Sequence, residues 1–178
     1  MRLRSRRTSR SLMAGRHTFR EEVSMKALLG AAALIAVLAS SAMAQDAMKH
    51  TKVTPDALTW KDNPAFPKGI KIATLVGDPT KAGGVVVLRI KFSANAHIPP
   101  HTHPYDEVVT LISGTIGTSE GEKFEKKGEM LKPGSLWVYP AKHAHYAWTG
   151  NEEAILQVQF IGPGGIDYIN PADDPRKK

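Results

Sequence analysis

The sequence contains no cysteine among its 178 residues. This absence excludes disulfide bonds, thiolate nucleophiles and cysteine-ligated zinc or iron–sulfur sites. With 42% apolar residues, a chain of this length can bury a core that is stable without such cross-links. Any metal site must therefore use histidine, carboxylate or carbonyl ligands.

An apolar run long enough to span a membrane is also missing from the N-terminal part. The run over residues 27–39 has 13 residues, whereas a bilayer needs about 20. Met25 and Lys26 precede it, and the small residues Ala42 and Ala44 follow, which is the layout of a secretory signal peptide. We therefore predict that the signal peptide is cleaved after Ala44 and that the mature protein is periplasmic or secreted.

Residues 1–24 contain seven arginines and no apolar periodicity. They fit a basic tail, a long start of the signal peptide, or codons upstream of the true start, and we favour a true start at Met25. A twin-arginine reading of Arg6 and Arg7 is weak, because this pair stands far ahead of the apolar run.

The mature part lacks the basic character that the overall charge of +7 suggests. Without residues 1–44 the chain keeps 16 basic and 15 acidic residues, a net charge of +1. No cluster of lysine and arginine interleaved with aromatic residues remains, so we expect no nucleic-acid partner.

Helical periodicity is missing from the mature part, which favours an all-β fold. The polar residues 45–68 include three prolines and are predicted to form an N-terminal arm, with Trp60 and Phe66 as its anchors. Short apolar runs separated by glycine and proline then predict a single β-sandwich or barrel over residues 69–165, followed by a tail over 166–178. Strands are predicted over 70–76, 85–92, 108–113, 115–118, 123–127, 135–138, 143–148, 154–161 and 166–169.

The segment from His101 to Glu107 carries the strongest chemical signal. On an extended backbone, His101 and His103 project from the same face, and a carboxylate four residues later can complete a facial set of ligands. A second segment leads from Gly134 through a turn at Pro140 to His145. A barrel can bring His145 opposite the first pair, although the spacing alone does not establish that they meet.

These two segments resemble the motifs of the cupin superfamily, G-x5-H-x-H-x3,4-E-x6-G and G-x5-P-x-G-x2-H-x3-N. All four metal-ligand positions are present, as His101, His103, Glu107 and His145. The departures are Asn95 and Lys142 in place of glycine, and Thr149 in place of the final asparagine. The resemblance covers about residues 70–162 and implies an antiparallel jelly-roll barrel, a metal inside it and a homodimer.

Several other residues leave two interpretations open. His101 and His103 alone could be loop histidines and His145 a core histidine, but their joint spacing favours a metal site. His143 is either a catalytic or second-sphere group beside His145 or an exposed residue at the start of a strand. His50 and His97 are expected at the surface, and the aromatic residues are expected in the core or at its rim, except for Tyr105, which could face a substrate.

Three histidines and one carboxylate leave open positions on a divalent transition metal, with manganese, iron and zinc as the candidates. Our first hypothesis is a dioxygenase-like or decarboxylase-like metalloenzyme for a small carboxylate or phenolic compound, in which Glu107 or His143 moves a proton. The second is a binding or sensing cupin that uses the same metal without turnover. A metal-free sugar-modifying cupin is a third possibility, which the complete ligand set argues against.

Overall fold

The computed structural model describes residues 50–178. The predicted leader over residues 1–24 and the predicted signal peptide over 25–44 lie outside the described residues, as do the first residues of the arm. In the described part, no helix is both long and apolar enough to cross a membrane.

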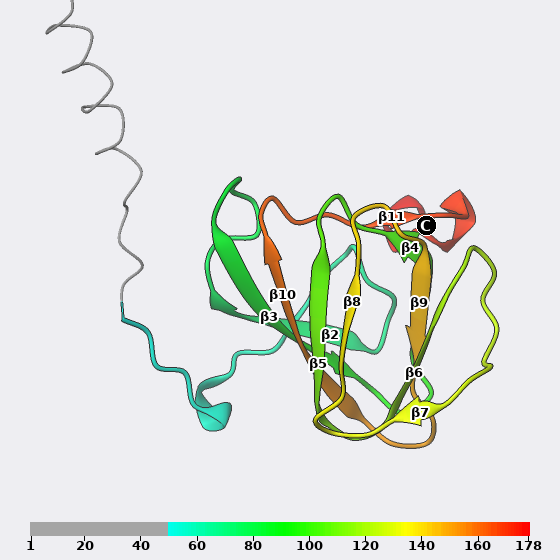
Figure 1. The fold of residues 1–178 in the computed structure, drawn as a ribbon, viewed down its shortest axis with the longest axis horizontal. Coiled ribbons are helices and arrows are strands. Elements are labelled where there is room, and N and C mark those ends of the chain that lie inside the picture. Colours follow the sequence, from blue (N-terminus) through cyan, green and yellow to red (C-terminus); the bar gives the residue numbers. More distant parts are fainter. Residues whose placement is uncertain (1–49) are drawn as a thin grey trace, which may run out of the picture. The chain divides into compact units, whose positions relative to one another are not determined.

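Residues 50–178 form two antiparallel β-sheets that enclose a common core (Figure 1). The six-stranded sheet has the order β1 (Lys61–Asp62), β2 (Ile70–Val76), β3 (Val85–Phe92), β10 (Ala154–Ile161), β5 (Glu107–Ser113), β8 (Leu136–Tyr139). The five-stranded sheet has the order β11 (Asp167–Tyr168), β4 (His97–Thr102), β9 (His145–Trp148), β6 (Ile116–Glu120), β7 (Met130–Leu131). This architecture confirms the predicted all-β jelly-roll fold.

Alternation along β3 and β10 decides which residues face the core. Every second residue of β3 from Val86 to Phe92 is buried, and the residues between them are half-buried. β10 repeats this pattern and pairs with β3 over its full length, from Ala154 opposite Phe92 to Ile161 opposite Val85. The inward side chains of both strands therefore form one apolar wall of the barrel.

The prediction of strands was correct where alternation is clearest, in β3 and β10, and it was wrong in more than one place. β2, β3 and β10 have the predicted bounds. Residues 123–127 form no strand but a loop, in which only Phe124 is half-buried. Since four of these five residues are exposed, little burial is available there to stabilise strand pairing.

The prediction missed β4, the strand that carries His101. Its two prolines are unusual in a strand, because proline cannot donate a hydrogen bond to a neighbour. The structure accommodates them at an irregularity: pairing between β4 and β9 shifts register between Ile98 and His101. On the other side of β4, the Pro100 carbonyl still accepts a hydrogen bond from the amide of Ile169.

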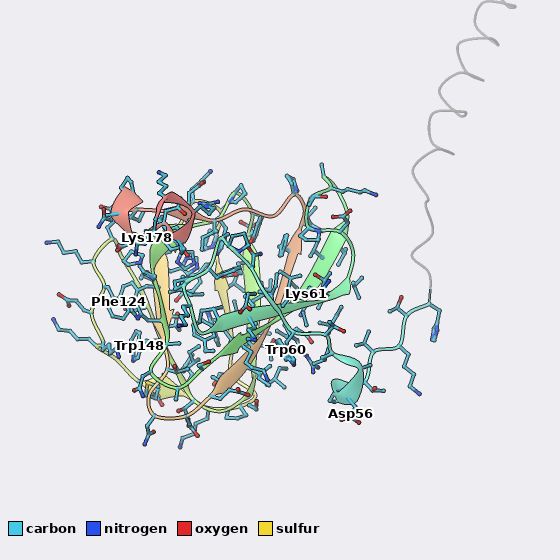
Figure 2. All side chains as sticks on the ribbon, turned by 180° about the vertical axis from the view of Figure 1, so that it is seen from behind. Asp56, Trp60, Lys61, Phe124, Trp148 and Lys178 are labelled. Carbon is cyan, nitrogen blue, oxygen red and sulfur yellow. The ribbon has the colours of Figure 1, made fainter. Side chains whose placement is uncertain are left out.

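The arm and the tail both contribute to the barrel. The arm contains the 3₁₀ turn η2 (Pro55–Ala57) and the strand β1, which pairs with β2. The ammonium of Lys91 lies 4.6 Å from the centre of the Trp60 ring, and Figure 2 shows Trp60 close to the sheet. The tail adds β11, which pairs with β4, followed by η3 (Pro171–Asp173) and η4 (Pro175–Lys177).

Candidate metal centre

The three predicted histidine ligands meet inside the barrel. His101 lies on β4 directly opposite His145, the first residue of β9, and His103 follows β4. One ligating atom from each ring lies within 4.8 Å of the others. All three residues are buried, with exposed fractions of 4–5%. Folding has therefore brought together residues that are 44 positions apart in the sequence.

Backbone carbonyls fix the orientation of each ring. The Nδ1 atom of every ring lies at hydrogen-bond distance from a carbonyl oxygen, so Nδ1 carries the proton and Nε2 keeps its lone pair. The accepting oxygens belong to Pro99 for His101 (2.7 Å), Gly165 for His103 (2.6 Å) and His143 for His145 (2.9 Å). Such a set presents three Nε2 nitrogens to the site, and these are atoms through which histidine binds a divalent metal.

The carboxylate of Glu107 faces the histidine cluster from the opposite sheet. Glu107 begins β5, and its side chain is 9% exposed. One carboxylate oxygen lies 3.6 Å from Nε2 of His103, and the other lies 3.3 Å from Nε2 of His145. The carboxylate thus faces the same nitrogens that point into the site, as a fourth ligand would.

Burial keeps His101 and His103 neutral. Desolvation lowers the pKa of His101 well below its usual value, and the neighbouring His145 and His103 lower it further. Desolvation also lowers the pKa of His103, although Glu107 partly opposes this effect. Protons therefore compete weakly for these nitrogens, which favours metal binding at neutral pH.

Two hydrogen bonds align the loop that carries the first motif with the loop that carries the second. The amide of Lys142 donates to the carbonyl of His103 at 2.8 Å. The amide of Ala141 donates to the Asp106 carboxylate, also at 2.8 Å. Sequence reasoning did not identify Asp106 as a functional residue, although an aspartate in a loop between ligands is a common acceptor for backbone amides.

The two positions at which glycine is replaced keep the backbone conformation that glycine favours. Asn95 has a φ of +56° and Lys142 a φ of +65°, and they are the described non-glycine residues with positive φ. Asparagine tolerates this left-handed conformation well and lysine less so. The departures from the cupin pattern therefore leave the turns intact.

Thr149, which replaces the final asparagine of the second motif, holds the turn at Asn95. Its side chain is fully buried. The hydroxyl donates to the carbonyl of Ser93 at 2.7 Å and accepts from the amide of Ala96 at 3.0 Å. Through these hydrogen bonds, Thr149 links the end of the second motif to the start of the first.

The four side chains line a cavity of about 50 Å³. Its walls are mainly apolar and come from both sheets, and several aromatic residues complete them. The other lining residues are Phe66, Leu88, Ile90, Phe92, Ile98, Tyr105, Val109, Thr118, Trp137, Tyr139, Ala147, Leu156 and Val158. The ring of Tyr139 stacks on His145 at 4.0 Å between ring centres, and its hydroxyl lies 2.8 Å from the Thr118 hydroxyl.

Tyr105 lies at the wall of this cavity. Its ring is stacked between His103, at 5.0 Å, and Phe160, at 4.0 Å between ring centres. Its hydroxyl lies 3.2 Å from Nδ1 of His103. Desolvation and, to a lesser degree, Glu107 raise the pKa of Tyr105, so the phenol keeps its proton at neutral pH.

His143 lies apart from the cavity lining. It precedes β9 in a turn, its side chain is 37% exposed, and its Nε2 lies 3.2 Å from the carboxylate of Glu120. Of the other histidines that the structure describes, His50 is exposed, and His97 is exposed with its ring against Phe124. These positions agree with the surface locations expected for His50 and His97.

The sequence model of the family described as Cupin matches residues 71–162, which is just over half of the chain. The chain belongs to the cupin family. Both motifs and all four predicted ligands lie within this cupin region.

Curated relatives of this cupin include plant germin-like proteins. It is 31% identical over 97 residues to putative germin-like protein 2-2 of Oryza sativa subsp. japonica, covering 49% of this chain and 42% of that protein. It is 27% identical over 95 residues to germin-like protein subfamily 1 member 7 of Arabidopsis thaliana, with coverages of 51% and 42%. The aligned part thus spans less than half the length of these relatives.

Solved structures share the fold of this cupin. The polyketide cyclase RemF from Streptomyces resistomycificus aligns with a TM-score of 0.58 at 19% identity, over 72% of this chain and 91% of that one. An RmlC-like cupin from Shewanella frigidimarina aligns with a TM-score of 0.51 at 17% identity, over 64% of this chain and 92% of that one. At these identities the likeness establishes the fold alone.

Proposed function

We propose that this cupin binds one divalent transition metal through His101, His103, Glu107 and His145. The observation that carries the proposal is the convergence of three Nε2 atoms and one buried carboxylate on a single cavity. Nitrogen and oxygen donors suit manganese, iron or zinc, and the carbonyls that hold each Nδ1 supply the outer support that metal-bound histidines need.

We propose further that the site is a small-molecule metalloenzyme of the dioxygenase or decarboxylase type. A bound metal would supply Lewis acidity and, if it is redox-active, the ability to react with O₂. Glu107 could move a proton at its carboxylate, and Tyr105 could donate a hydrogen bond from its protonated hydroxyl. The cavity of about 50 Å³ has room for roughly three to five waters, so a small carboxylate fits more readily than a phenolic ring.

A binding or sensing role is the alternative, and the position of His143 favours it. His143 was a predicted acid or base, but its ring pairs with Glu120 and does not line the cavity. If His143 takes no part in the chemistry, Glu107 and Tyr105 are the remaining candidates for proton transfer, and a sensor requires neither.

The metal site can be tested by metal analysis of purified protein. We expect about one metal ion per chain in the wild type and almost none after His101→Ala combined with His145→Ala, because two of four ligands are lost. His97→Ala is the matched control and should keep the metal. Full occupancy in the double variant would contradict the ligand assignment.

To distinguish an enzyme from a binding or sensing protein, the metal-loaded protein is tested with a panel of small carboxylates and phenols. We expect the metal-loaded protein to consume O₂ or release CO₂ with at least one of them. Thermal stabilisation by a panel member without turnover, with every candidate metal tried, would instead support the binding role.

We also propose that the mature protein is exported after cleavage behind Ala44 and forms a homodimer. Amino-terminal sequencing of the protein from a host with an intact export system tests the cleavage, and a mature start at Gln45 is expected. The exposed apolar side chains of β8 support the homodimer, with Leu136 at 62% and Val138 at 51% exposure.

A further inference from the structure

One wall of the metal cavity contains a buried donor that has no acceptor. Trp137 lies on β8, opposite Val109 of β5, and both residues line the cavity. Its indole nitrogen is buried and makes no hydrogen bond. Arg89 is the other described residue with such an atom, and it does not line the cavity.

Apart from the Nε2 atoms and the carboxylate that are proposed to hold the metal, the polar side-chain groups of the cavity have partners among the described residues. The histidine Nδ1 atoms are held by carbonyls, and the hydroxyl of Tyr139 is paired with that of Thr118. In native proteins roughly 90% or more of buried polar groups are hydrogen-bonded, so an isolated donor beside a binding site calls for an acceptor. The apolar wall around Trp137 offers none, which leaves a molecule inside the cavity to supply it.

Charge and volume restrict what that molecule can be, provided that the proposed metal is bound. Three neutral histidines, one carboxylate and one divalent cation leave a net charge of +1 in a buried site, which favours an anionic ligand. The cavity of about 50 Å³ holds roughly three to five water positions, so the ligand must be small.

We propose that the Trp137 indole N–H binds an oxygen of a small carboxylate anion whose other end lies at the metal. This assignment rests on the proposed metal centre. It adds Trp137, on the sheet opposite the histidines, as a residue that selects the ligand. It gives the ligand two fixed points, since the metal holds one end and Trp137 orients the other. Anions too short to reach the indole lose this second contact.

The direct test is an ¹H–¹⁵N spectrum of the zinc-loaded protein, which has three tryptophans. Trp137→Phe identifies the Trp137 indole signal by its loss. On addition of glycolate we expect this signal to move downfield, because its proton gains an acceptor, while the Trp60 and Trp148 signals stay in place. A Trp137 signal that stays in place at saturating glycolate would overturn the proposal. Because glycolate is added to the wild type, the result does not depend on whether a variant binds the ligand.

Affinity provides the second test. With cobalt-loaded protein, whose visible spectrum reports on the metal, we expect Trp137→Phe to weaken glycolate binding about tenfold or more, as loss of a hydrogen bond to a charged group does. Fluoride, which reaches only the metal, should bind with unchanged affinity. Trp60→Phe, on the arm outside the cavity, is the matched control and should bind both ions normally.

The outcomes separate this inference from the proposed function. If all variants hold metal but glycolate affinity changes less than twofold in Trp137→Phe, or glycolate fails to bind the wild type, the Trp137 assignment is wrong and the metal centre stands. If the wild type holds no metal, the metal centre itself is contradicted, and the assignment falls with it.

Discussion

At the residue scale, the site depends on groups that prepare each ligand before any metal binds. Three carbonyls select the tautomer of the histidines, and burial lowers the pKa of His101 and His103. Neutral rings with a fixed Nε2 lose little freedom when they bind a cation. Because the pKa values of His101 and His103 are lowered, we also expect the stability of the metal-free protein to depend on pH.

We predict that the metal-free protein loses stability as the pH falls below about 6.5, the usual pKa of histidine. Below that value the unfolded chain takes up protons at His101 and His103, whereas the folded chain does not until the pH reaches their lowered pKa values. Stability is therefore present above the unfolded pKa and declines as the pH drops through it.

Urea unfolding of the metal-free protein at pH 7.5 and pH 5.5 measures this effect. His101→Gln should reduce the difference between the two free energies, and the exposed His50→Gln should leave it unchanged. Equal stability of the wild type at both pH values would rule out the proposed linkage.

Thr149 is predicted to contribute to stability through its hydroxyl. Thr149→Val keeps the shape of the side chain but leaves the amide of Ala96 without its side-chain acceptor, so we expect a loss of about 1–3 kcal/mol in the free energy of unfolding. Thr149→Ser retains the hydroxyl and should lose less. Chemical denaturation of the two variants checks the order, and a valine variant as stable as the serine variant would contradict the role.

At the element scale, turns act together with the pairing of β4 and β9 to align the two motifs. The loop after β4 is tied to the turn before β9 by the amides of Ala141 and Lys142. Gly114, the last residue of the first motif, forms the turn between β5 and β6 with a φ of +75°. A Cβ atom there would meet the carbonyl oxygen of Glu153.

Gly114→Ala should therefore be clearly destabilising. The left-handed conformation alone costs a non-glycine residue roughly 1–2 kcal/mol, and the close approach of Glu153 adds to it. Gly121→Ala is the control, because Gly121 also has a positive φ but no atom near the position of a Cβ. Thermal unfolding of both variants is the measurement, and equal losses would show that the close approach is unimportant.

At the scale of the whole molecule, the outer side of β8 is an exposed apolar surface. β8 is the edge strand of the six-stranded sheet, and it exposes Leu136 and Val138 to solvent. An exposed apolar edge strand favours association with another chain, and a symmetric pair of identical edges closes into a dimer. The inner side of the same strand carries Trp137 and Tyr139 into the metal cavity.

We predict that the mature protein elutes as a dimer in size-exclusion chromatography and that Leu136→Lys with Val138→Lys elutes as a monomer. Charges at these positions would be buried without partners in the interface. Val53→Lys, at another exposed apolar residue, should leave the dimer intact. Metal content should stay the same in all three proteins, and a wild-type monomer at every concentration tested would contradict the proposed dimer.

The sequence by itself determined the fold class, the bounds of β2, β3 and β10, and the identity of the candidate ligands. Alternating burial is a local property of a strand, and it can be read wherever apolar and polar residues alternate. It failed for β4, whose two prolines lie where the pairing with β9 shifts register. It failed also for residues 123–127, whose side chains find little to pack against.

Only the tertiary structure decided how the ligand set works. The convergence of His101, His103 and His145, and the carbonyls that orient them, come from segments far apart in the chain. The same folding placed His143 beside Glu120 and the indole of Trp137 at the cavity wall. No local pattern encodes these contacts, because each depends on how two sheets pack across a shared core.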